Sequence, residues 1–220
     1  MTGQIIPKEQ RKALNEKVLY LIDNNLTEQY KISKQDVYNA YTGDGGLHDL
    51  NYKEFGSYHS FSEAKKEIEN GQFFTPPALA NFLVDCIQPN DYDLIIDLTS
   101  GMGSFFNFLP NELNVYGNEL DLKAFKVARF LYPNATLTNQ DIRYFTSEVK
   151  FDVVLGNPPF NLQWEVGNSK YVSQLFYCMK AAEVLKNGGL MALIVPKSFL
   201  ADDFSDSGMI KEVEHYFDFI

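Results

Sequence analysis

Residues 93–103, with the sequence DLIIDLTSGMG, decide the fold class of this chain. The apolar run around Ile95 and Ile96 is typical of a strand covered on both faces, as in a parallel sheet. Gly101 and Gly103 follow where such a strand turns into a helix, and glycines there let the backbone approach a ligand closely. The stretch predicts either a ligand-binding turn at a helix start or a plain tight turn.

Two further apolar runs, residues 151–156 (FDVVLG) and 190–195 (LMALIV), are also predicted to be buried strands. Residues 114–119 and 135–141 are weaker strand candidates. The helical stretches between them are residues 76–87, 121–132 and 173–189. Alternating strands and helices predict right-handed crossovers and an α/β fold, a Rossmann-like, doubly wound, mostly parallel sheet.

The N-terminal part of the chain has a helical pattern. Apolar positions at helical spacing predict a helix within residues 8–25. Further helices are expected to start at Ser33 and Ser60, because each is followed three residues later by the acid of a capping box, Asp36 and Glu63.

These patterns divide the chain into an N-terminal helical region, residues 1–70, and a catalytic core, residues 71–220. The last six residues, HYFDFI (215–220), are expected to be a helix running into a new strand. A sheet that ends in the middle of a strand predicts a core truncated at its C-terminal end.

The composition favours a folded domain of acidic character. Of the 220 residues, 45% are hydrophobic and 15% aromatic, which argues against global disorder. The net charge is −10, and residues 71–220 contribute −8 of it, from 10 basic and 18 acidic residues. A free-standing nucleic-acid binder usually has a basic surface, so this balance counts against a DNA substrate.

Other features predict a cytoplasmic protein. No apolar run approaches the ~20 residues that span a bilayer, and the first residues lack a stretch of signal-peptide length. The 2 cysteines, Cys86 and Cys178, have no metal-type spacing, and no metal site is expected. We expect both to be small buried hydrophobes in a reducing compartment.

Two acids follow the weaker strands. Glu119 ends the second predicted strand, where a carboxylate can accept both hydroxyls of a ribose, and Asp141 ends the third, where it can accept an amino hydrogen of adenine. Each alone can be a solvated acid, but together they describe an adenosine-sized crevice. An acid at the position of Glu119 could also bind the ribose of NAD. However, residues 101–106 (GMGSFF) lack the third small residue of the dinucleotide-binding motif.

The loop after the fourth strand reads Asn157-Pro158-Pro159-Phe160. Proline has no N–H, so the loop presents mainly acceptors. The Asn157 side-chain oxygen and the Pro158 carbonyl can accept both hydrogens of one planar NH₂ group, which stabilises the positive charge that develops when its nitrogen attacks. Phe160 can stack on the ring that carries this group. The alternative is a proline-rich turn without a catalytic role.

With this loop, the chain resembles the S-adenosylmethionine-dependent amino-methyltransferases, whose motif is Asp/Asn/Ser-Pro-Pro-Tyr/Phe. GQFFTPP (71–77) precedes the glycine turn, which is the order of the gamma class of DNA N6-adenine methyltransferases. That class includes the modification subunits of type I restriction systems and many fused restriction-modification enzymes. The matching segments after the turn are GNELD (117–121), QDIRYF (140–145), NPPF (157–160) and GGLMALIVP (188–196).

The resemblance implies S-adenosylmethionine as the cofactor and transfer of its methyl group to N6 of adenine in DNA. Thr75 is expected to contact the methionine moiety, Glu119 the ribose and Asp141 the adenine. Thr75 is also a good N-cap, with Pro76 at the first helical position. The expected cofactor-binding residues are Phe74, Thr75, Pro76, Asp97, Thr99, Gly101, Gly103, Glu119, Leu120, Asp141 and Ile142. The expected catalytic residues are Asn157, Pro158, Pro159 and Phe160.

Adenine N6 lies on the base-pairing edge, so the base must be flipped out of duplex DNA. Phe160 can stack on it, and residues 161–171 are expected to be a loop that closes over it. Trp164 in that loop fits a core or lid residue better than a base contact. Lys170 and Lys197-Ser198 are candidate phosphate contacts.

The resemblance leaves the substrate and the partners open. Relatives with the same loop methylate protein glutamines or RNA bases, and a glutamine amide is also a planar NH₂ group. The family's target-recognition domain has no counterpart here, so specificity for DNA is expected to come from a separate or deleted domain or subunit. A cofactor-binding subunit that is inactive without a partner is the third alternative. No membrane partner is expected.

Overall fold

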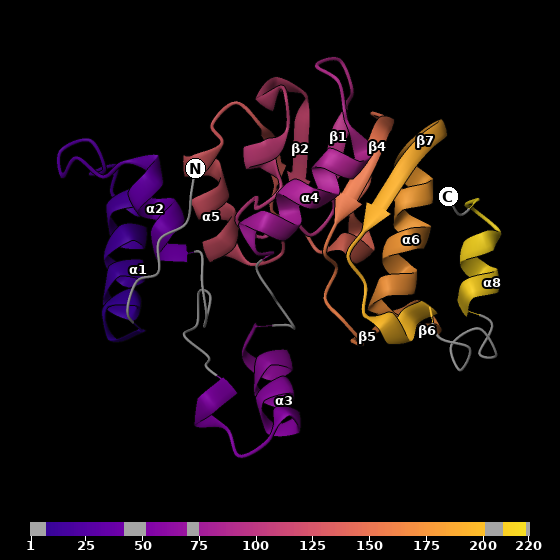
Figure 1. Ribbon diagram of the computed structural model, residues 1–220, viewed down its shortest axis with the longest axis horizontal. Coiled ribbons are helices and arrows are strands. Elements are labelled where there is room, and N and C mark those ends of the chain that lie inside the picture. The colour runs from indigo at the N-terminus through magenta and orange to yellow at the C-terminus, as the bar shows by residue number, and fades with distance from the viewer. Residues whose placement is uncertain (1–7, 42–51, 70–74, 201–208, 219–220) are drawn as a thin grey trace.

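A five-stranded parallel sheet forms the centre of the molecule, with the strand order β3-β2-β1-β4-β7 (Figure 1). The computed structural model describes residues 8–41, 52–69, 75–200 and 209–218. The strands are β1 (Ile95–Asp97), β2 (Val115–Asn118), β3 (Thr136–Thr138), β4 (Phe151–Gly156) and β7 (Leu185–Leu193). The α/β fold with a doubly wound parallel sheet is confirmed.

Both faces of the sheet are covered by helices, which explains the continuous apolar strands. On one face, Ile95 packs in the same cluster as residues of α4 (Pro77–Ile87) and α5 (Leu122–Leu131). On the other face, its neighbour Ile96 packs in the cluster of α6 (Ser173–Val184). Adjacent strand residues point to opposite faces, so one run of apolar residues fills two cores.

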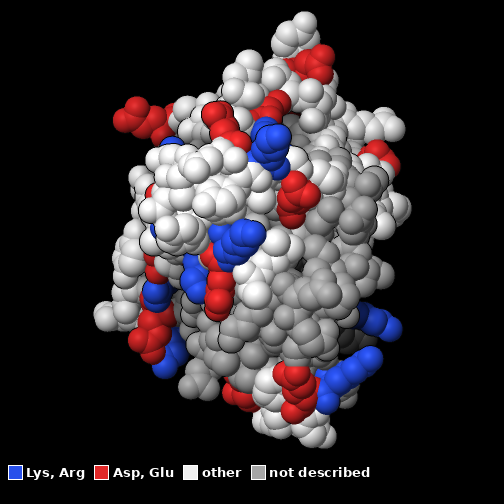
Figure 2. Space-filling view, turned by 90° about the vertical axis from the view of Figure 1, so that its left-hand side faces the viewer, with Lys and Arg blue, Asp and Glu red and all other residues white. Residues whose placement is uncertain are grey.

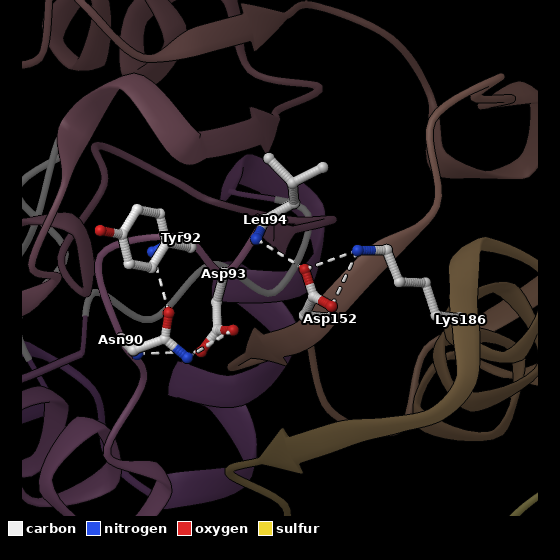
Figure 3. Close-up of polar contacts among 6 residues, drawn as sticks. All are labelled: Asn90, Tyr92, Asp93, Leu94, Asp152 and Lys186. Atoms are coloured by element: carbon white, nitrogen blue, oxygen red, sulfur yellow. Dashed lines mark hydrogen bonds and ion pairs between the residues drawn. The ribbon is translucent and has the colours of Figure 1, made fainter.

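Asp152 fixes the relative positions of three strands at the edge where they begin (Figure 3). Its Oδ2 accepts the Leu94 N–H at 2.9 Å, next to β1, and both carboxylate oxygens lie 2.8 Å from Lys186 Nζ on β7. Hydrogen bonds from Lys186 and from the Leu94 N–H lower the pKa of Asp152. In the turn before β1, Asp93 accepts the N–H and the side-chain amide of Asn90 (Figure 3).

The N-terminal helices α1 (Lys8–Asp23) and α2 (Lys34–Tyr41) share the apolar cluster of α5. The predicted capping box at the start of α2 is confirmed: Ser33 N–H and Oγ donate to Asp36 Oδ2 at 2.9 and 2.6 Å. Figure 2 shows the molecule from the side of these helices. Lys and Arg lie interspersed with Asp and Glu there, and no continuous basic area is visible among the described residues.

Two predicted helix boundaries are wrong. Helix α3 (Tyr58–Glu69) begins before Ser60, and the Ser60 N–H donates to Ser57 Oγ at 3.1 Å, so Ser57 has the capping position. The helix predicted for residues 173–189 ends at Val184, because strand pairing with β4 starts at Leu185.

Residues 161–171 are not an irregular loop. They contain most of an antiparallel hairpin, β5 (Gln163–Val166) and β6 (Ser169–Val172), with Gly167 at a φ of 61° in its turn. The alternation of polar and apolar side chains in QWEV was a sequence signal for the first of these strands.

The strand expected within residues 215–220 is absent from the part that the structure describes. Helix α8 (Met209–Glu214) ends before it, and residues 217–218 are not in a strand; residues 219–220 lie outside the described residues.

Cys178 is buried as expected, but Cys86 is exposed, since it lies on the outer side of α4. Among the described residues, no helix combines the length and apolar character that crossing a membrane requires.

Candidate active site

The predicted site residues lie where the parallel strands end. In Figure 1 the arrows of β4 and β7 point toward the side on which β5, β6 and α3 are found. At this edge Asn118, the last residue of β2, donates through Nδ2 to the carbonyls of Leu98 and Gln140, at 3.2 and 3.0 Å. Its Oδ1 accepts the Thr138 hydroxyl at 2.9 Å. Asn118 therefore holds the ends of β1, β2 and β3 together, a role that the sequence analysis missed.

Asp97 ends β1 and is 1% exposed. Its Oδ1 accepts the Thr99 N–H at 3.0 Å and lies 3.4 Å from the Tyr177 hydroxyl. Burial raises the pKa of Asp97 to about 7, and the nearby charge of Glu119 adds to this, although the Thr99 hydrogen bond opposes it. A buried carboxylate at the start of a turn is suited to orienting the loop that follows.

The glycine turn is shaped by its two glycines and by Glu119. Gly101 and Gly103 have φ values of 56° and 82°, which favour glycine. A Cβ on Gly103 would lie 2.6 Å from the Phe106 ring, so this position also has no room for a side chain. The Gly101 N–H donates to Glu119 Oε2 at 2.7 Å, which joins the turn to the end of β2.

Glu119 is buried and accepts two backbone N–H groups. Besides Gly101, the Asp121 N–H donates to its Oε1 at 2.7 Å. Burial raises the pKa of Glu119 to about 7 against the effect of these hydrogen bonds. Leu120, the next residue, is 52% exposed, which leaves an apolar surface beside the acid.

Asp141 has a partner that the sequence analysis did not assign. Arg143 Nε lies 3.0 and 2.9 Å from its two carboxylate oxygens, and Nη2 lies 2.5 Å from Oδ2. Burial opposes ionisation of Asp141, but the hydrogen bonds and charge of Arg143 outweigh it and lower the pKa. The Arg143 N–H also donates to Asp141 Oδ1 at 2.9 Å, and Ile142 beside the acid is buried.

The structure brings Thr75 and Asn157 together. Asn157 Nδ2 donates to Thr75 Oγ1 at 3.2 Å across 82 residues of sequence, and Thr75 is 5% exposed. The prediction that Thr75 caps α4 is wrong: the N-cap is Pro76, without a side-chain cap, and Pro77 is the first helical residue. Phe74, also expected here, lies outside the described residues.

The Asn157–Phe160 loop leaves β4 directly. The Gly156 carbonyl still accepts the Ile194 N–H at 2.9 Å, whereas Pro158 is buried without a strand partner and Phe160 is half-buried. In the adjoining hairpin, Trp164 packs edge-on against Phe176 of α6, with ring centroids 5.7 Å apart, which fits the lid or core interpretation.

Neither lysine is a clear phosphate contact. Lys170 forms an exposed ion pair with Glu165 across the hairpin at 2.8 Å, and Lys197 is exposed at the start of a 3-10 helix.

These geometric features define an S-adenosylmethionine-dependent methyltransferase fold, with a glycine turn and acids at the strand ends and an Asn-Pro-Pro-Phe loop beside them. The fold matches that of the type I restriction-modification system methyltransferase subunit from Streptococcus thermophilus, with a TM-score of 0.54 and 19% identity. The match covers 97% of this chain and 60% of that subunit.

The chain belongs to the N-6 DNA methylase family, whose sequence model matches residues 57–213. It is 23% identical to the type II methyltransferase M.CvrRI of Paramecium bursaria Chlorella virus XZ-6E, over 67% of this chain and 41% of that protein. It is 28% identical to the type I restriction enzyme MjaIX methylase subunit of Methanocaldococcus jannaschii, over 50% of this chain and 22% of that subunit. The chain thus spans less than half the length of these curated relatives.

Proposed function

We propose that this chain binds S-adenosylmethionine at the ends of β1, β2 and β3 and transfers its methyl group to N6 of adenine in DNA. The observation that carries the proposal is the contact between Asn157 and Thr75, because it joins the amino-accepting loop to the element expected at the methionine moiety. Membership of the N-6 DNA methylase family supports the choice of substrate.

The residues at the strand ends fit the proposed cofactor. Thr99 Oγ1 is buried and has no hydrogen-bond partner among the described residues, so a bound polar group would satisfy it. Gly101 and Gly103 give the turn its backbone conformation, and we assign the Glu119 carboxylate to the two ribose hydroxyls. We assign Asp141 and Ile142 to the adenine ring, with Leu120 packing beside it.

The cofactor supplies an electrophilic methyl group on a positively charged sulfur. In the protein, the Asn157 Nδ2 bond to Thr75 orients the amide, so that Oδ1 is the acceptor for the substrate. Oδ1 and the Pro158 carbonyl accept hydrogen bonds from the two N6–H groups and stabilise the positive charge that develops on nitrogen. The nitrogen–methyl bond would form as the sulfur–methyl bond breaks, and one N6 proton would then leave to solvent. Phe160 stacks on the flipped base, which contributes about 1–3 kcal/mol.

Recognition of a DNA sequence would need a further partner. The net charge of −10 counts against a phosphate-binding surface, and on the one face that Figure 2 shows, the charges of the described residues are mixed. We propose that a target-recognition domain or subunit supplies it; the two type I relatives are themselves named as subunits.

The same acidic balance favours a second candidate substrate, a glutamine amide of a protein, over both DNA and RNA. A protein glutamine amide or an RNA base amino group presents the same planar NH₂ to Asn157, and a protein substrate needs no basic surface. A core that binds the cofactor but needs a partner for chemistry is a further candidate.

The proposal is tested with S-adenosylmethionine carrying a labelled methyl group, offered separately with unmethylated plasmid DNA, RNA and a cell lysate. N6-methyladenine in the DNA supports the proposal, while label only in RNA or protein supports the second candidate. Cofactor binding without label in any substrate indicates a core that needs a partner.

Asn157→Ala tests the role of the loop. We expect turnover to fall by about 10²–10³-fold, the usual effect of losing one group that stabilises the transition state, with cofactor affinity within a few-fold. Asn24→Ala, an exposed asparagine whose side chain donates to the Tyr20 carbonyl on α1, is the matched control. Turnover that survives Asn157→Ala would remove the assignment of this loop.

A further inference from the structure

Three polar side chains of α6 face the interior. Ser173, Gln174 and Tyr177 are each 0% exposed. Buried polar groups are nearly always hydrogen-bonded, so their partners indicate what they hold in place. Ser173 and Tyr177 are four residues apart and therefore lie on the same face of the helix.

Ser173 holds the chain directly after the two prolines. Its Oγ donates to the Pro159 carbonyl at 2.5 Å and accepts the Leu162 N–H at 3.2 Å. The Ser173 N–H donates to the Leu162 carbonyl at 2.9 Å. One serine thus fixes both ends of the segment from residue 159 to residue 162.

Gln174 holds the residue in the middle of this segment. Its Oε1 accepts the Asn161 N–H at 3.0 Å, and its Nε2 donates to Asn161 Oδ1 at 3.1 Å. Asn161 has a φ of 58°, a conformation that asparagine tolerates better than most residues but that is still unfavourable. The two bonds to Gln174 stabilise this bend, by which the chain leaves Phe160 and enters the hairpin.

Tyr177 holds the chain before the loop. Its hydroxyl donates to the Leu155 carbonyl at 2.8 Å and accepts the Leu98 N–H at 3.1 Å, with Asp97 Oδ1 at 3.4 Å. It therefore connects the end of β4 to the start of the glycine turn. Gly156 makes this contact possible, since a Cβ there would lie 2.2 Å from the hydroxyl.

We infer that α6 braces the Asn157–Phe160 loop from both sides, and that Ser173, Gln174 and Tyr177 are positioning residues for it. Acceptors stabilise a developing charge best when they are already oriented before the reaction. The prolines remove N–H donors from the loop itself, so its conformation depends on bonds made by its neighbours. This inference rests on the proposed function for its catalytic meaning, but the brace is a property of the protein alone.

The brace is tested by amide hydrogen exchange of the intact chain, read at single residues by NMR. In Ser173→Ala we expect the Leu162 amide to exchange at least about tenfold faster, because it loses its acceptor, while amides inside β4 keep their rates. Ser147→Ala is the matched control. Its Oγ also donates to a carbonyl and accepts an N–H, both of Val149, away from the loop. An unchanged Leu162 rate in Ser173→Ala would overturn the inference.

A positioning role also predicts a division between binding and turnover. In Ser173→Ala and Gln174→Met we expect kcat to fall at least about tenfold, with the cofactor Kd within about twofold, because neither residue contacts the glycine turn. In Tyr177→Phe we expect kcat to fall and the cofactor Kd to rise, since the Tyr177 hydroxyl contacts Leu98, at the start of the glycine turn, as well as Leu155. Equal losses of affinity and turnover in all three variants would indicate a general structural role and contradict the inference.

Tyr132→Phe is the control for Tyr177→Phe. Tyr132 is also buried, but its hydroxyl has no hydrogen-bond partner in the described part of the chain, so its removal should change neither quantity. If the unmodified chain transfers no methyl group to any substrate, the proposed function is in question, whereas the exchange rates still decide whether α6 is a brace.

Discussion

Gly156 is the position at which one added methyl group should disturb both parts of the site. It is the last residue of β4 and directly precedes Asn157. An alanine Cβ would lie 2.2 Å from Tyr177 Oη, 2.8 Å from Tyr177 Cζ and 3.2 Å from Asp97 Oδ1. Normal carbon contacts begin near 3.5 Å, so the tyrosine ring would have to move by roughly 1 Å.

That movement has two energetic consequences. Overpacking in a close-packed core costs about 1–3 kcal/mol. The hydroxyl would also lose its bonds to the Leu98 N–H and the Leu155 carbonyl, now 3.1 and 2.8 Å long, at a residue that is 0% exposed. Leaving buried groups unsatisfied costs a further ~1–3 kcal/mol, so we expect Gly156→Ala to lower the free energy of unfolding by about 3–5 kcal/mol.

The measurement is urea unfolding followed by circular dichroism, with the m-value checked for constancy. Gly56→Ala is the control, because an added Cβ there meets no atom within 4 Å, and no loss is expected. Tyr177→Phe combined with Gly156→Ala removes the atom at 2.2 Å, so the two losses should be less than additive. A loss below about 1 kcal/mol for Gly156→Ala, or strictly additive losses, would refute the steric reasoning.

The remaining predictions concern charges. Glu119→Ala should weaken S-adenosylmethionine binding by about 10- to 100-fold in calorimetry, because hydrogen bonds to a charged group contribute ~1.5–3 kcal/mol; unchanged affinity would remove the ribose assignment. Burial raises the pKa of Asp97 to about 7, so the folded state keeps a proton that the unfolded chain releases at lower pH, and stability falls as the pH rises toward 7. Between pH 5 and 8 this carboxyl should lower the free energy of unfolding by about 2–3 kcal/mol, and Asp97→Asn should flatten the curve; parallel curves would contradict the raised pKa. Asp152→Ala should destabilise the protein by about 1–2 kcal/mol, because it leaves the Leu94 N–H without its acceptor. Lys186→Ala should destabilise it by less than about 1 kcal/mol, because the Lys186 side chain is 45% exposed. Equal losses in urea unfolding would show that only the ion pair matters.

The fold was predictable because its signals are local. Residues 93–98, 151–156 and 190–195 read as strands buried on both faces, and the structure has β1, β4 and β7 there. Burial is confirmed for β1 and most of β4, but it is wrong for β7, an edge strand that is mostly half-buried or exposed. Element ends were less predictable: the helix predicted to reach residue 189 stops at Val184, because Leu185 pairs with Phe151 of β4. The hairpin after Phe160 was missed because its two strands are short and half-exposed.

The amino-acid sequence by itself determined which kinds of groups follow each strand: glycines and a hydroxyl after β1, acids after β2 and β3, and an acceptor-rich loop after β4. Tertiary structure alone decided which of them touch. Thr75 meets Asn157, Arg143 holds both oxygens of Asp141, and α6 holds the loop from both sides. The physical reason is that strand order and helix packing, rather than distance along the chain, set which side chains share an edge of the sheet.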